Sequence, residues 1–252
     1  VPTGTTTYVV TGTDTNGCTN TDTVVVTVNT LPVMTASPDQ DICPGTSAQL
    51  TASGAQTYSW SPATGLSCAN CNNPVASPDT TTTYIVTGVV GATGCSDTES
   101  VTVNLLPQPD ISAGPDKEIC FGKSTTISAS GGQSYIWSPA AGLSCTNCDT
   151  PIASPTATTT YTLIGTGPNG CTDTANVMVT VNSLPVIDAG SVQAVCEDET
   201  LQLHVTGANT YNWTPTDYLS CTSCSDPVVA PQGNITYTIS GIDGHGCVDT
   251  TT

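Results

Sequence analysis

The fold is decided by the stretch Tyr58-Ser59-Trp60-Ser61-Pro62, followed by Gly65-Leu66-Ser67-Cys68-Ala69-Asn70-Cys71. The same string returns around Trp137 and again around Trp213, so the three tryptophans stand 77 and 76 residues apart. A fixed period of this length is typical of an array of small, similar domains. It argues against an enzyme, because an active site brings unlike residues together whereas an array repeats one surface.

The composition around this stretch favours β-structure. About one residue in five is Thr and Val is frequent, and both are β-branched residues suited to strands. Gly and Pro fall between the apolar stretches, and no run shows the apolar spacing of a helix. In the first repeat the expected strands cover Pro32–Ala36, Ala48–Ser53, Thr57–Ser61, Pro74–Ser77, a stretch from Tyr84 through Thr87 and a final one with Val101 and Val103, after a turn at Gly91–Gly94.

A Trp on the third of these strands and a Tyr at the start of the strand before the last predict an immunoglobulin-like sandwich. The predicted fold is all-β, with tandem immunoglobulin-like β-sandwich domains arranged as a rod. The expected core residues are Trp60, Trp137, Trp213, Tyr84, Tyr161 and Tyr237. A second set of tyrosines, Tyr58, Tyr135 and Tyr211, would suit sugar stacking if exposed, but their two-residue spacing from each Trp favours packing.

Short joints of the form Val-Asn…Leu-Pro divide the chain, because Pro blocks continuation of a strand. The predicted divisions are 1–32, the last strands of a truncated domain, then domains at 33–107, 108–184 and 185–252, the last with an incomplete final strand. Both ends fall in mid-repeat, which suggests a window cut from a longer array. The alternative is that open ends complete one another between subunits by strand donation.

Thirteen cysteines are present, and each complete repeat carries four. Regular, even numbers of cysteines in small β domains are typical of disulfides formed in an oxidising compartment, which predicts an extracellular protein. The two cysteines of each CxxC loop are close enough to bond each other, whereas zinc would need two such pairs to converge. The predicted disulfide cysteines are Cys68, Cys71, Cys145, Cys148, Cys221 and Cys224 in these loops, and Cys43, Cys95, Cys120, Cys171, Cys196 and Cys247 outside them.

Two pairings are open for the cysteines outside the loops. A bond within each repeat, such as Cys43 to Cys95, would contribute roughly 4 kcal/mol and leave the odd Cys18 a partner upstream. However, the turn before the second strand and the last hairpin of a sandwich lie at opposite ends, roughly 25–30 Å apart. In a tandem array these ends meet between neighbours, so the alternative is a ladder in which Cys43 bonds Cys171 and Cys120 bonds Cys247. We favour the bond within the repeat, because it makes each repeat self-sufficient.

The formal charge is −18, with two lysines and no arginine. Nucleic acid is an unexpected partner, since phosphate binding needs Lys and Arg, and no apolar run is long enough for membrane insertion. The acidity favours solubility, with Ca²⁺ as an alternative near the joints at Asp39, Asp41, Asp116 and Asp188. We expect no other cofactor, and no catalytic or metal role for His204 or His245, which do not recur in the other repeats.

The repeated string, together with Asn-Gly-Cys at Asn16-Gly17-Cys18 and Asn169-Gly170-Cys171, resembles the Ig-like and PKD-like repeats of large secreted surface proteins of Bacteroidetes-type bacteria. Those proteins are often gliding-motility-associated or cargo of type IX secretion. The resemblance implies O-glycans on Asp-Thr units, here at Thr23, Thr80, Thr174 and Thr250.

The sequence thus predicts an extracellular fibre or stalk that assembles with further copies of the same repeats. The alternative is an adhesin arm that binds surface glycans, with or without Ca²⁺.

Overall fold

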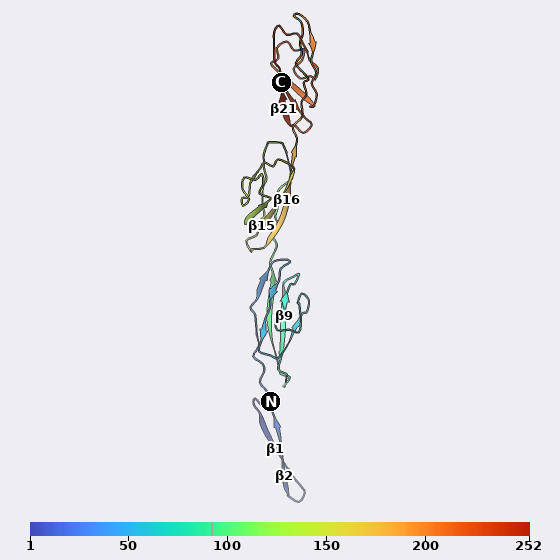
Figure 1. Ribbon diagram of the computed structural model, residues 1–252. Helices are drawn as coiled ribbons and strands as arrows, with labels where there is room; N and C mark the ends of the chain where they lie inside the picture. The colour runs from blue at the N-terminus through green and yellow to red at the C-terminus, as the bar shows by residue number, and fades with distance from the viewer. Residues whose placement is uncertain (92) are drawn as a thin grey trace. The chain divides into compact units, whose positions relative to one another are not determined.

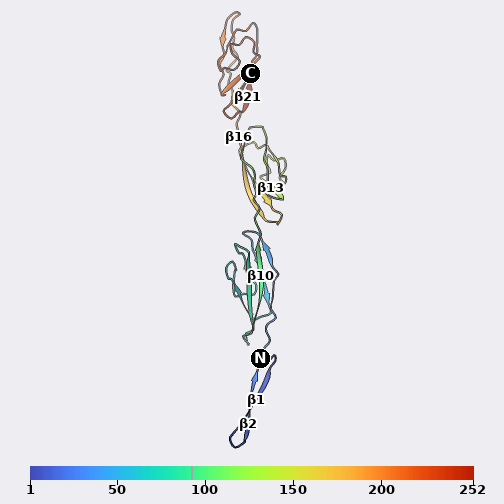
Figure 2. The same ribbon diagram turned by 180° about the vertical axis from the view of Figure 1, so that it is seen from behind.

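The computed structural model describes residues 1–91 and 93–252, and among them it contains strands but no helix. The chain divides into two compact units, Val1–Gln108 and Pro109–Thr252. Figures 1 and 2 show each unit from opposite sides. None of the described residues forms a helix long and apolar enough to cross a membrane.

The first unit begins with a β-hairpin. Strand β1 (Thr6–Thr13) pairs antiparallel with β2 (Thr19–Val26) over eight residues. The Asp14 carboxylate accepts the backbone N–H groups of Asn16 and Cys18 and closes the turn. Both strands are exposed almost throughout, as Figure 1 shows for β1 and β2.

The rest of the first unit is a two-layer sandwich. One sheet has the order β4-β10-β9-β7, and the facing layer contains the pairs β3-β6 and β5-β8. The strands are β3 (Thr35–Ala36), β4 (Gln40–Ile42), β5 (Ala48–Gln49), β6 (Ala52–Ser53), β7 (Thr57–Ser61), β8 (Val75–Ala76), β9 (Thr82–Val89) and β10 (Ser96–Leu105). Strand β4 runs parallel to the end of β10.

Two expected strands are divided in the structure. The first strand pairs with β6 only at Thr35–Ala36, and after Pro38 the chain crosses to the other sheet as β4. The second strand is two strands, because β5 pairs with β8 whereas β6 pairs with β3. The expected turn at Gly91–Gly94 includes Ala92, which lies outside the described residues.

The second unit contains two further cores. In one, the sheet order is β11-β16-β15-β13 opposite β12-β14; in the other it is β18-β20-β21 with β17-β19. The strands are β11 (Lys117–Cys120), β12 (Thr125–Thr126), β13 (Ser134–Ser138), β14 (Ile152–Ala153), β15 (Thr159–Thr166), β16 (Thr172–Asn182), β17 (Leu201–Gln202), β18 (Thr210–Thr214), β19 (Val228–Val229), β20 (Thr238–Ile242) and β21 (Val248–Thr251).

Each core is closed by inward residues that alternate along the strands. In β9 the buried positions are Tyr84, Val86 and Gly88, with exposed or half-buried residues between them. The first two cores also bury two valines from their last strand, Val101 and Val103 in one and Val177 and Val179 in the other. The chain therefore has the predicted all-β fold of tandem immunoglobulin-like sandwiches.

Candidate functional site

Each tryptophan fastens the disulfide loop of its own repeat onto the core. Trp60 is 2% exposed, and its indole Nε1–H donates to the Cys71 carbonyl at 2.8 Å. Cys71 is in turn bonded to Cys68, and the loop is pinned again by the Trp60 N–H, which donates to the Ala69 carbonyl. The second and third repeats have the same bonds at Trp137 with Cys145–Cys148 and at Trp213 with Cys221–Cys224. The motif that recurs in the sequence therefore holds the disulfide loop against the core.

Three equivalent tyrosines hold the other end of the segment that carries the disulfide loop. They are Tyr84 in β9, Tyr161 in β15 and Tyr237, just before β20. The Tyr84 hydroxyl donates to the Thr64 carbonyl at 3.0 Å, and Tyr161 and Tyr237 do the same to Ala141 and Asp217. Burial raises the pKa of each of these phenols, so they stay neutral donors.

The second set of tyrosines also serves the fold. The hydroxyls of Tyr58, Tyr135 and Tyr211 each donate to a carbonyl three residues upstream, and these side chains pack on the cores. They do not form an exposed stacking platform.

One disulfide joins two different cores. Cys120, at the end of β11, is bonded to Cys247, just before β21, with the two Cα atoms 5.5 Å apart. The pairing that we favoured within a repeat is wrong here, and the alternative between neighbouring repeats is the one formed. Cys95 and Cys196, which we expected to be bonded, are free, as is Cys18. Cys43 and Cys171 are also disulfide-bonded.

Strand length explains why a bond within the repeat cannot form. Cys120 pairs across the sheet with Asn182 at the far end of β16, whereas Cys171 immediately precedes β16. The intervening 11 residues span about 36 Å at ~3.3 Å per residue. A disulfide requires Cα atoms within about 7 Å, so Cys120 and Cys171 are too far apart.

The acidic residues considered for Ca²⁺ serve as hydrogen-bond acceptors. Asp39 and Asp116 accept the backbone N–H groups of Thr102 and Met178 at 2.8 Å, which ties the crossing segment to the last strand of its sandwich. Asp41 accepts the side chain of Asn104, and Asp188 accepts the N–H of Gly190. Within residues 1–91 and 93–252, no three His, Cys, Asp or Glu side chains converge to hold a metal.

The two histidines lie on the surface of the third repeat. The ring of His204 contacts the carboxylate of Asp226, which also accepts a hydrogen bond from Ser225. The hydrogen bond from Ser225, followed by that from His204, lowers the pKa of Asp226. Since the serine bonds to the carboxylate and not to the imidazole, the group lacks the contact that activates a nucleophile. His245 donates its backbone N–H to Asp243 in a turn.

The predicted glycan acceptors are all exposed. In three of the four Asp-Thr units the carboxylate accepts the N–H of the threonine that follows it, at Thr23, Thr174 and Thr250. Thr80 is exposed as well. Glycosylation at these four positions stays a prediction.

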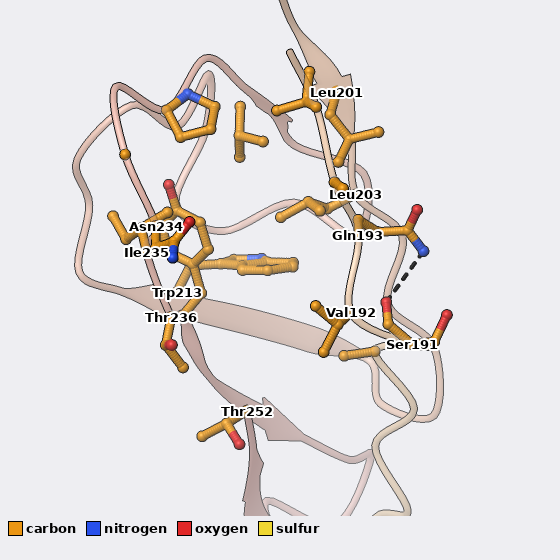
Figure 3. Close-up of a pocket in the computed structure, with 18 of the residues that line it drawn as sticks. Ser191, Val192, Gln193, Leu201, Leu203, Trp213, Asn234, Ile235, Thr236 and Thr252 are labelled. Carbon is orange, nitrogen blue, oxygen red and sulfur yellow. Dashed lines mark hydrogen bonds between the residues drawn. The ribbon is translucent and has the colours of Figure 1, made fainter. Parts of the chain in front are cut away.

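The third core contains a cavity of about 840 Å³. It lies between two chain segments, Ala189–Glu197 and Pro231–Tyr237, and Trp213 reaches it from the core. Figure 3 shows the Trp213 indole between the segment that carries Ile235 and the segment that carries Val192. Sequence reasoning predicted an incomplete last strand here, but no residue pattern announced a cavity.

No protein-family model matches the chain, and no curated protein matches it. Solved structures resemble it in fold. The N-terminal eight Ig domains of the Down syndrome cell adhesion molecule are 14% identical over 97% of this chain and 45% of that one, with a TM-score of 0.39. A three-Ig segment of titin is 10% identical over 88% and 97%, with a TM-score of 0.40. A Ca²⁺-stabilised adhesin from an Antarctic bacterium that binds ice is 12% identical over 97% and 79%, with a TM-score of 0.33.

Proposed function

We propose that the chain is part of an extracellular fibre or stalk, in which repeats at 33–107, 108–184 and 185–252 carry tension. The observation that carries this proposal is the Cys120–Cys247 disulfide, whose cysteines lie 127 residues apart in sequence and in different cores. A force that pulls on the two ends of the second unit passes through this covalent bond. The residues between the two cysteines, which include Trp137 and Trp213, are then outside the force path.

The strand order of the second core supports the same role. Its first sheet strand, β11, lies beside its last strand, β16, and the two run parallel from Lys117↔Val179 to Cys120↔Asn182. Once the Cys120–Cys247 bond is reduced, tension enters at the start of β11 and leaves at the end of β16, so it pulls the two strands along their axes in opposite directions. Their hydrogen bonds are then loaded together rather than one after another, which resists separation.

Measurements on single molecules test this function. The whole chain is held between a surface and a bead at constant force, first in oxidising buffer and then in reductant. A fibre element keeps its length until the disulfides are reduced and then lengthens abruptly. A length that is the same in both buffers would contradict the proposal. Retention of the chain on a glycan surface, with or without Ca²⁺, would favour the adhesin arm instead.

A further inference from the structure

The CxxC loops are held in place by hydrogen bonds that do not depend on their disulfides. In the first repeat, the backbone N–H of Trp60 donates to the Ala69 carbonyl at 2.7 Å, and its indole N–H donates to the Cys71 carbonyl at 2.8 Å. Trp137 holds the second loop with the same two bonds. Because the core binds the loop through its backbone, the sulfurs of Cys68 and Cys71 should stay side by side when the bond between them is reduced.

The two sulfurs of the first loop lie in different surroundings. The hydroxyl of Ser67 accepts the N–H of Val75 at 2.9 Å, so its own proton is free to point to the Cys68 Sγ, which lies 3.9 Å away. The Cys71 Sγ lies instead 3.7 Å from the carbonyl oxygen of Cys68. A hydroxyl donor favours a thiolate, whereas a carbonyl accepts a hydrogen bond only from a protonated thiol. After reduction, Cys68 is therefore suited to be the thiolate, and Cys71 is suited to keep its proton.

The second loop has the same asymmetry. The hydroxyl of Ser144 accepts the N–H of Ile152 at 2.9 Å and lies 3.7 Å from the Cys145 Sγ. The Cys148 Sγ lies 3.9 Å from the carbonyl oxygen of Cys145. In both repeats the serine stands directly before the first cysteine of the loop, and a backbone N–H eight residues further along the chain fixes its hydroxyl. The asymmetry between the two sulfurs is therefore a property of the repeat and not of one loop.

The loops are also open to solvent, unlike the disulfide that joins the second and third cores. Cys68 and Cys71 are half-buried, and Ser67 and Asn70 beside them are exposed. Cys247, by contrast, is 0% exposed. Disulfide exchange requires that an external thiolate reach one of the two sulfurs, so access decides which bond reacts. The loops can therefore react while the cores stay folded.

We propose that the CxxC loops exchange disulfides with external dithiols, an activity separate from the fibre function. One substrate thiolate attacks the Cys68 Sγ, which forms a mixed disulfide and releases the Cys71 sulfur to take up a proton. The second substrate thiolate then attacks the substrate sulfur of the mixed disulfide and releases Cys68 as a thiolate, to which the Ser67 hydroxyl donates. The substrate loses two electrons and the loop gains them; of the two substrate protons, one ends on Cys71 and one in solvent. The reverse sequence restores the loop disulfide.

Variants of the whole chain with one cysteine of a loop replaced test which sulfur reacts. In oxidised glutathione, Cys71→Ser should capture one glutathione at Cys68 about tenfold faster than Cys68→Ser captures one at Cys71, as peptide mass spectrometry measures. Adding Ser67→Ala to Cys71→Ser should slow the capture several-fold, and Ser67→Thr, which keeps the hydroxyl, should restore it. Ser144→Ala is the matched control, because it removes the same hydroxyl from the other loop and should leave capture at Cys68 unchanged.

The unaltered chain tests whether exchange occurs in the folded state. Its free thiols are first blocked with iodoacetamide, and dithiothreitol is then added at low concentration. Alkylation and peptide mapping should show Cys68–Cys71 and Cys145–Cys148 reduced about tenfold faster than Cys120–Cys247, while amide hydrogen exchange in β9 and β15 stays unchanged. With a synthetic peptide that carries two thiols in place of dithiothreitol, one oxidised peptide should appear for each loop reduced.

Three results would each overturn the proposal. The loops are reduced no faster than Cys120–Cys247, the strands lose protection from hydrogen exchange as the loops open, or Cys68→Ser and Cys71→Ser capture glutathione equally fast. The constant-force experiment does not depend on exchange at the loops, so a failure here alone leaves the fibre function standing.

Discussion

Removing the disulfide between the second and third cores should lengthen the stretched second unit by several hundred ångströms. The Cα atoms of Cys120 and Cys247 are 5.5 Å apart in the fold, and the residues are separated by 127 positions. An extended chain adds about 3.3–3.6 Å per residue, so the variant Cys120→Ser/Cys247→Ser should gain roughly 410–450 Å at full extension. The pulling handles belong on exposed Asp110 and on the C-terminus, which keeps the first unit out of the force path.

The matched control removes a disulfide that carries no load. Cys145 and Cys148 are only three residues apart and lie inside the loop closed by Cys120 and Cys247. Replacing both by Ser should leave the fully extended length unchanged in oxidising buffer. The reasoning is refuted if unaltered chain and Cys120→Ser/Cys247→Ser reach the same length, since force would then travel along the backbone in both.

Three changes test the interior. Trp137→Phe should destabilise the second core by about 2–4 kcal/mol, because it removes part of a buried ring and leaves the Cys148 carbonyl without its donor. Trp213→Phe should cost less stability, since its ring borders an open cavity. Hydrogen exchange measures the stability of each core separately and so compares the two variants. Gly131→Ala should lower the free energy of unfolding by at least about 3 kcal/mol, because the new Cβ would overlap the Asp110 carbonyl at a φ of +89°. The control Gly122→Ala, with φ +78° and open space around it, should cost about 1 kcal/mol. Equal losses in denaturant unfolding would rule out the overlap. Because the pKa of Tyr161 is raised, the folded chain keeps a proton that the unfolded chain loses near pH 10. The contribution of Tyr161 to stability should therefore be constant below that pH and fall above it. Tyr161→Phe should make the alkaline loss of stability shallower in unfolding curves.

The repeat, the all-β class and the packing of the tryptophans were predictable, because each depends on residues close together in sequence. Trp60 donates a hydrogen bond to the carbonyl of Cys71, which lies 11 positions further along the chain, and the spacing of the motif already fixes this distance in sequence. The partner of Cys120 was not predictable in the same way. It depends on how far β16 runs before the chain turns, and a strand of 11 residues is long enough to separate Cys120 from Cys171.

Strand β4 was missed for a related reason. It has three residues, two of them polar, and follows Pro38, so neither length nor alternation marks it as a strand. Its pairing depends on the end of β10, which is more than 60 residues away. Contacts of this kind become visible only when the whole sandwich is assembled.

The position of the Cys120–Cys247 disulfide decides which strands carry tension. Strand β16 lies inside the loop that this bond closes, so the parallel pair of β11 and β16 resists shear only after the bond is reduced. The bond from Cys120 to Cys247 leads tension around β16 and around the third core as far as Cys247, so these parts keep their fold while the chain is under load.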